Sequence, residues 1–145
     1  MSQDPDTDNS GDTAAAPPPP FVLAELSDRC MGSAAVATLV LDKLEKQLVD
    51  DIREIERLVG VRDSEQIGRT AHALKGAAGA AAAPALRDLA AKIETLARQD
   101  RLAAIAEEMP ALHAEVMRCL ACLPAAREGL QGAKPGGPPG TGAGP

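Results

Sequence analysis

The sequence predicts an all-α protein, an antiparallel four-helix bundle with a short additional helix on its N-terminal side. The first observation is composition: 45% of the 145 residues are hydrophobic but only 1% are aromatic, which suits helices packed closely on small side chains. The second is that apolar residues recur at helical spacing through the middle of the chain, where no convincing strand pattern is found. The third is that most prolines and many glycines lie near the two ends, which leaves a middle long enough for one domain with one core.

Both ends of the chain have compositions that cannot build a core. Residues 1–20 contain four aspartates and then four consecutive prolines, and we expect a disordered acidic, proline-rich tail there. Residues 131–145 are rich in glycine and proline and are expected to form a second disordered tail. The bundle is therefore expected over residues 21–130.

The first two helices are separated by a short connection. A short helix is expected from about Val22 to Cys30, and Ser33 is a good N-cap for a long helix that reaches about Val59. Gly60 is placed to end that long helix. The apolar stripe of the long helix contains Val40 or Leu41, Leu44, Leu48, Ile52, Ile55 and Val59.

The third helix carries His72. Asp63 or Ser64 can cap its start, and Glu65 and Gln66 suit its first turn. Because the apolar positions lie opposite the histidine, His72 is predicted to point outward. The expected buried face contains Ile67, Thr70, Leu74, Ala77, Ala78 and Ala81.

Two further helices complete the bundle. Pro84 suits the first turn of the fourth helix, whose inward residues are expected to be Leu86, Leu89, Ile93 and Leu96. Asp100 is expected to begin the last helical segment, and Pro110 should produce a kink or a break within it. The apolar stripe of this last segment contains Leu102, Ile105, Met109, Leu112, Val116, Leu120 and Leu123.

Three glycines surround His72 on the third helix. At about 100° per residue, Gly68, Gly76 and Gly79 all lie within about 40° of the histidine. Each glycine in a helix interior costs about 1 kcal/mol relative to alanine, so about 3 kcal/mol is given up on one stripe. A face cleared of side chains lets a partner's active site approach the imidazole closely. The pattern therefore indicates chemistry performed on His72 rather than by it.

The stretch Ala71-His72-Ala73-Leu74-Lys75-Gly76 resembles the phosphorylation motif of histidine phosphotransfer (HPt) domains, His-x-Leu-Lys-Gly, which lies within a helix of a four-helix bundle. The resemblance covers roughly residues 22–125 and includes Ile93-Glu94, a hydrophobic-Glu pair common in that family. It implies a phosphocarrier without autonomous kinase activity. Such a protein accepts a phosphoryl group on His72 from a receiver-domain aspartate and passes it to another receiver in a multistep phosphorelay. The implied partners are response-regulator receiver domains and a sensor or hybrid histidine kinase.

The residue types around the histidine suit this chemistry. A neutral imidazole can attack phosphorus through one nitrogen, and transfer then depends on positioning and charge neutralisation. Lys75, one turn along, is expected to offer a positive charge to the phosphate oxygens. Arg69 on the other flank is expected to do likewise or to pair with an acidic receiver surface. The expected partner-binding face consists of Gly68, Arg69, Gly76 and Gly79.

Two features limit what the resemblance implies. Glu65 is the only acid on the face of the third helix that carries His72, so the chain is expected to hold no metal or other cofactor. Mg²⁺ is expected in the partner receiver domain. The chain also departs from the family after Gly79. Many members have a small polar residue and a glycine there, whereas residues 80–83 are all alanine. No partner for the second nitrogen of the imidazole is therefore expected from the motif.

Other classes of function make different demands on the sequence. A non-catalytic helical adaptor, an HPt-like bundle that binds a receiver or kinase without transferring phosphate, remains the alternative. A ferritin-like metal site needs Glu-x-x-His pairs, but Arg69 and Pro110 stand three residues before the two histidines. Cys119 and Cys122 form a C-x-x-C without a second pair and are expected to be structural thiols. His113 is expected to be an ordinary surface or boundary residue.

Charge and segment composition give expectations about location. A net charge of −6 argues against nucleic acid or an anionic membrane as a partner. The chain lacks a secretory signal and an apolar run of the roughly 18 residues needed to span a bilayer. Three sparse cysteines agree with a reducing compartment. We therefore expect a cytoplasmic protein, and a monomer.

Overall fold

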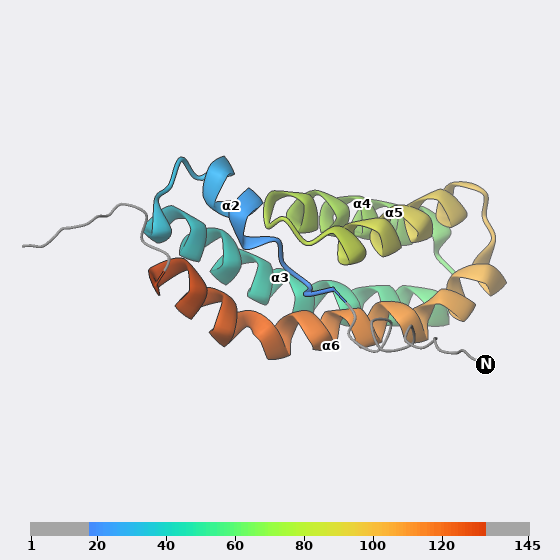
Figure 1. Ribbon diagram of the computed structural model, residues 1–145. Helices are drawn as coiled ribbons and strands as arrows, with labels where there is room; N and C mark the ends of the chain where they lie inside the picture. The colour runs from blue at the N-terminus through green and yellow to red at the C-terminus, as the bar shows by residue number, and fades with distance from the viewer. Residues whose placement is uncertain (1–17, 133–145) are drawn as a thin grey trace, which may run out of the picture.

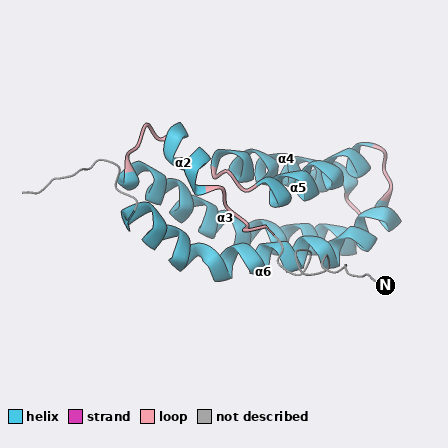
Figure 2. Cartoon of the chain, viewed as in Figure 1, coloured by secondary structure: helices cyan, strands magenta, loops and turns pink. Residues whose placement is uncertain are grey.

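The computed structural model describes residues 18–132, which form helices and no strand (Figures 1 and 2). The predicted all-α class is confirmed. The helices are α2 (Leu23–Arg29), α3 (Ala34–Val61), α4 (Ser64–Ala80), α5 (Pro84–Arg98) and α6 (Leu102–Gly132).

The four long helices form a closed bundle. Helix α3 packs against α4 and α6, and α5 packs against the same two neighbours from the other side. Connections of two or three residues join α3 to α4, α4 to α5 and α5 to α6, so consecutive helices run in opposite directions. Figure 1 shows α4 and α5 above α3 and α6, with α2 at the end of the bundle where α4 ends. This is the predicted bundle with a short additional helix.

Local signals set most helix starts. The Ser33 hydroxyl accepts from the Val36 N–H at 3.2 Å, and the Asp63 carboxylate accepts from the Gln66 N–H at 3.1 Å. Both are N-caps of the expected kind, each satisfying a backbone donor that the first helical turn leaves free. Pro84 occupies the first turn of α5, as predicted.

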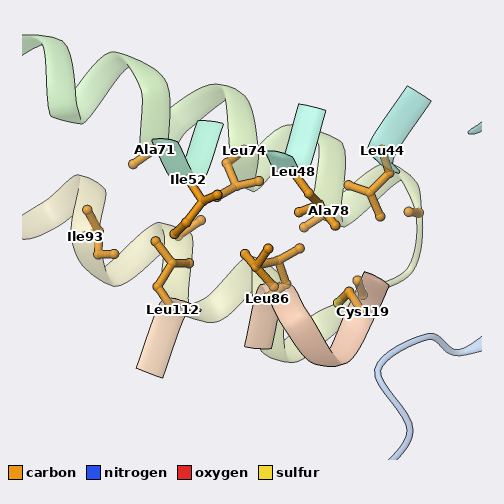
Figure 3. Close-up of a cluster of buried hydrophobic side chains, with 14 of the residues drawn as sticks. Leu44, Leu48, Ile52, Ala71, Leu74, Ala78, Leu86, Ile93, Leu112 and Cys119 are labelled. Atoms are coloured by element: carbon orange, nitrogen blue, oxygen red, sulfur yellow. The ribbon is translucent and has the colours of Figure 1, made fainter. Parts of the chain in front are cut away.

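The core consists of aliphatic and alanine side chains from all the helices. Figure 3 shows Ala71, Leu74 and Ala78 of α4 turned toward side chains of the neighbouring helices. Thr70 and Ala77, expected to be buried, are only half-buried, whereas Ala71 is fully buried. The buried face is rotated toward α5 because α4 packs more extensively on α5 than on α3. The largest fully buried side chains are Leu26, Leu41, Leu44, Leu48, Ile55, Ile67, Leu74, Leu86, Ile93, Ile105, Leu112 and Leu123.

The prediction that Gly60 ends α3 is wrong. The helix continues to Val61, and Arg62 adopts the left-handed conformation with φ 61°. The Asp63 N–H then donates to the Leu58 carbonyl at 3.1 Å, which closes the helix end. The stop is therefore fixed by Asp63, which closes α3 with its backbone and opens α4 with its side chain.

Asp100 does not begin the last helix. It follows α5 in the left-handed conformation with φ 55°, and its N–H donates to the Ala97 carbonyl at 3.0 Å. Its carboxylate accepts from the Ser64 hydroxyl at 2.7 Å, across the end of the bundle, and so is committed to α4. Helix α6 begins at Leu102.

Pro110 does not break α6, which continues through it and through Pro124 (Figure 1). A proline in a helix removes one N–H and leaves the carbonyl four residues earlier without its partner. Pro110 and Ala106 are both exposed, so water can satisfy that carbonyl.

The segment before α2 lies along the bundle. Phe21, the single aromatic residue, is buried, the Val22 N–H donates to the Ala82 carbonyl at 2.8 Å, and Arg118 Nη1 donates to the Pro18 carbonyl at 2.9 Å. The predicted tails fall mostly on residues 1–17 and 133–145, which lie outside the described range. No helix within residues 18–132 combines the length and apolar character needed to cross a membrane.

Candidate functional site

His72 lies in the middle of α4 with 68% of its side chain exposed. The preceding residue, Ala71, faces the bundle and is fully buried, and Leu74 is buried as well. Burial of those neighbours fixes the rotation of α4 and turns the imidazole toward solvent. The predicted outward orientation of His72 is confirmed.

The imidazole has a partner that the sequence analysis did not provide. Nδ1 of His72 lies 2.8 Å from Oε2 of Glu94, a side chain of α5 that is only 7% exposed. The same carboxylate is 2.7 Å from Lys75 Nζ through Oε1 and 2.7 Å from Arg98 Nη2 through Oε2. Glu65 is the only acid on the face of α4 that carries His72, as stated from the sequence, but α5 adds Glu94 beside it. The second imidazole nitrogen, for which the motif supplied no partner, is bound to this carboxylate.

These contacts determine which nitrogen of the His72 ring carries its proton. The hydrogen bond from Lys75 and, to a lesser degree, those of His72 and the charge of Arg98 hold the pKa of Glu94 below its usual value, although burial alone would raise it. An ionised carboxylate only accepts hydrogen bonds. Nδ1 of His72 must therefore carry the proton, which leaves the lone pair of the neutral ring on Nε2, the nitrogen not bound to Glu94.

Two grooves flank the histidine. The α4–α5 groove, of about 560 Å³, includes His72, Glu94 and Arg98 in its wall, and Gly68 and Ala97 also line it. The α3–α4 groove, of about 350 Å³, lies on the side of Gly76. The site therefore consists of an exposed imidazole with a concave surface on either side.

Comparison with protein families gives a match to the model described as Hpt domain over residues 39–126, more than half of the chain. The chain belongs to the Hpt domain family. Hpt domains are the histidine phosphotransfer modules of two-component phosphorelays, and the predicted resemblance is confirmed. The match contains the whole of α4 and α5, with His72, Lys75 and Glu94. Comparisons with curated proteins and with solved structures gave no match.

A signal for Glu94 was present in the sequence of this Hpt domain. On α5, Glu94 falls among Ala90, Ile93 and Ala97, all of which are buried. A carboxylate within an apolar stripe needs hydrogen-bond donors, because an unpaired buried charge is strongly unfavourable. The position alone therefore predicts a partner, whereas identifying His72 as that partner requires the register between two helices.

The three glycines of the Hpt motif region have different surroundings. A Cβ added at Gly76 would meet no atom within 4 Å, so Gly76 does keep an exposed face open. A Cβ at Gly68 would lie 3.4 Å from Cβ of Ala97, and one at Gly79 would lie 3.7 Å from Cδ of Arg87. The interpretation of all three as a cleared face is therefore corrected for Gly68, which allows α4 and α5 to approach closely.

The cations beside His72 are all engaged. Lys75 is 34% exposed and bound to Glu94, and Arg98 shares the same carboxylate. Arg69 lies 2.9 Å from Glu65, with both side chains well exposed. An exposed pair of this kind contributes little and exchanges partners readily. Contact between these cations and a phosphoryl group remains a prediction.

The remaining candidates of this Hpt domain lie away from the site. His113 is exposed, with Nε2 3.8 Å from Oε2 of Glu56. Burial raises the pKa of the Cys119 thiol to about 12, which makes it unreactive, and Cys122 is half-buried on the same helix. Among residues 18–132, no three His, Cys, Asp or Glu side chains are grouped to hold a metal ion.

Proposed function

We propose that this Hpt domain is a phosphocarrier, which accepts a phosphoryl group on Nε2 of His72 from a receiver-domain aspartate and passes it to another receiver. The observation that carries the proposal is the contact of Nδ1 with the buried, ionised carboxylate of Glu94 at 2.8 Å. That contact orients the ring and leaves Nε2 as the free nucleophile.

Transfer to His72 exchanges a phosphorus–oxygen bond of the receiver for a phosphorus–nitrogen bond. The Nε2 lone pair attacks phosphorus, the N–P bond forms, and the bond from phosphorus to the aspartyl oxygen breaks, which returns the receiver carboxylate. Positive charge develops on the ring as the bond forms. Glu94 stabilises that charge through the Nδ1–H hydrogen bond without having to reorganise. The reverse steps hand the phosphoryl group to a second receiver.

The flanking residues complete the proposed site. Lys75 keeps Glu94 ionised and supplies positive charge one turn from the imidazole, and Arg69 pairs with an acidic receiver surface once it leaves Glu65. Gly76 and Gly79 contribute to the face on which the receiver sits, and Gly68 lines the adjoining α4–α5 groove. Mg²⁺ belongs to the receiver, and the nucleotide chemistry belongs to a sensor or hybrid histidine kinase.

The test is transfer from phosphorylated receivers to the purified chain. We expect label on the wild-type chain that is acid-labile and base-stable, as a phosphoramidate requires. His72→Gln should abolish labelling while helicity and melting temperature change little, because the side chain is exposed. His113→Gln is the matched control and should label normally. If the wild-type chain binds receivers but takes label from none of them, the chain is an adaptor instead.

A further inference from the structure

Three contacts between α4 and α5 follow one another at intervals of one helical turn along the α4–α5 groove. The contacts pair Ser64 with Asp100, Gly68 with Ala97, and His72 with Glu94. Successive members are four residues apart on α4 and three residues apart on α5, and a helical turn contains about 3.6 residues. The three contacts therefore belong to a single register of these two antiparallel helices (Figure 1), and a shift at one of them displaces the others.

The contact at the end of the groove joins two groups that the backbone holds in place. Ser64 Oγ donates to Oδ1 of Asp100 at 2.7 Å. Asp100 is left-handed with φ 55°, and its N–H donates to the Ala97 carbonyl at 3.0 Å, which ties it to the end of α5. Ser64 is the first residue of α4 and directly follows the Asp63 N-cap. Because each group is tied to its own helix, their hydrogen bond sets the position of α4 along α5.

The three donors that bind Glu94 differ in how well they tolerate a change of register. Arg98 lies on α5 together with Glu94 and moves with it, and Lys75 reaches the carboxylate through a flexible four-carbon chain. His72 has a short, planar side chain, whose Nδ1 lies 2.8 Å from Oε2 of Glu94. A displacement of α5 along α4 therefore breaks the contact of His72 first, while Lys75 and Arg98 still neutralise the carboxylate.

We propose that Ser64 and Asp100 are positioning residues for phosphoryl transfer, which hold α5 in the register that places the Glu94 carboxylate on Nδ1 of His72. The inference rests on the proposed function and deepens it, because the tautomer of His72 decides which nitrogen is free to receive the phosphoryl group. Ser64 and Asp100 act through Glu94, from about two helical turns away along the groove.

Four substitutions separate this hydrogen bond from the backbone around it. Ser64→Ala removes the donor, and Ser64→Thr keeps it. Asp100→Gly removes the acceptor with a residue type that adopts the left-handed conformation readily, and Asp100→Asn keeps an acceptor oxygen. Arg62→Gly is the matched control, since Arg62 is also left-handed, in the α3–α4 connection, and lies outside the α4–α5 groove.

The first readout is the ¹H–¹⁵N imidazole spectrum of the unphosphorylated chain, at a pH at which the ring is neutral. It reports the tautomer of His72 without any phosphoryl transfer. The wild-type chain, Ser64→Thr, Asp100→Asn and Arg62→Gly should each show one tautomer, with the proton on Nδ1. Ser64→Ala and Asp100→Gly should show a mixture of the two tautomers and faster exchange of the ring proton with water.

The second readout is the rate at which phosphoramidate, a small donor that needs no docking surface, labels His72. The nitrogen–phosphorus bond of the donor breaks as the Nε2–phosphorus bond forms, and ammonia is released. The rate should fall by about tenfold in Ser64→Ala and Asp100→Gly, because misplacement by about 1 Å costs up to about 100-fold. It should recover in Ser64→Thr and Asp100→Asn.

Two results would overturn the proposal. One is a single Nδ1-protonated tautomer and wild-type labelling in both Ser64→Ala and Asp100→Gly. The other is slower labelling with a lower melting temperature but an unchanged His72 spectrum, because the two residues would then serve stability alone. An altered tautomer in these variants, together with a wild-type chain that takes label from no donor, would support the positioning and count against the proposed function alone.

Discussion

Replacement of Glu94 by glutamine is the most informative perturbation of the site. Glu94 is 7% exposed and receives hydrogen bonds from His72, Lys75 and Arg98. An amide of the same shape keeps one acceptor oxygen but turns an NH₂ group toward a cation. Charge-assisted hydrogen bonds contribute about 1.5–3 kcal/mol each when buried, and Lys75 and Arg98 are partly exposed, so we expect a loss of about 1–3 kcal/mol in the free energy of unfolding.

The effect of Glu94→Gln on transfer should exceed its effect on folding. The variant loses the charge that balances the developing imidazolium. Loss of the carboxylate partner of a metal-binding histidine costs about 10–100-fold in affinity or activity, and we expect a decrease of that order in the rate of transfer. The assay is the initial rate of transfer from a phosphorylated receiver, with urea unfolding measured on the same preparation. Glu107→Gln, which alters an exposed acid of α6 outside both grooves, should leave both quantities unchanged. A Glu94→Gln protein that is folded and transfers at the wild-type rate would refute the role assigned to this carboxylate.

Three further predictions concern stability and charge. Gly76→Ala should raise the free energy of unfolding by up to about 1 kcal/mol in urea titrations, whereas Gly76→Gln should obstruct the receiver and slow transfer. Lys75→Ala should slow transfer, whereas Lys75→Arg should retain most of the wild-type rate. The difference in rate between wild type and Lys75→Ala should shrink at high salt, which screens exposed charges. The double variant Arg69→Ala with Lys75→Ala tests whether one cation substitutes for the other. Because folding lowers the pKa of Glu94, its contribution to the free energy of unfolding should be fully present above the ordinary pKa of 4.5. That contribution should be lost as pH falls through the lower pKa of the folded protein. Acid titrations of unfolding should show this loss in the wild-type chain and not in Glu94→Gln.

The features predicted correctly from the sequence are those with local causes. The caps at Ser33 and Asp63, the start of α5 at Pro84 and the outward orientation of His72 each depend on residues within about two helical turns. The prediction that α3 ends at Gly60 was wrong because the capping of the next helix also influences where α3 ends. Here Asp63, which caps α4, sets the boundary between α3 and α4.

The contact between His72 and Glu94 has a different origin. The two residues are 22 positions apart, on helices whose relative register is set by the packing of the whole α4–α5 pair. The role of Gly68 in helix packing also depends on the neighbouring helix, because it is evident only from the position of Ala97 on α5. The periodicity of one helix predicts which face is buried, but it does not predict which residue of the neighbouring helix lies opposite.

The central claim is that Nε2 of His72 carries the phosphoryl group while Nδ1 stays protonated against Glu94. Its most direct test is a ¹H–¹⁵N imidazole spectrum of the ¹⁵N-labelled chain, recorded before and after incubation with a phosphorylated receiver. We expect the His72 ring alone to change, with phosphorus coupled to Nε2, the Nδ1 proton retained and the His113 ring unaltered. Phosphorus on Nδ1, phosphorylation of His113, or an unchanged His72 ring in a receiver-bound chain would contradict the account.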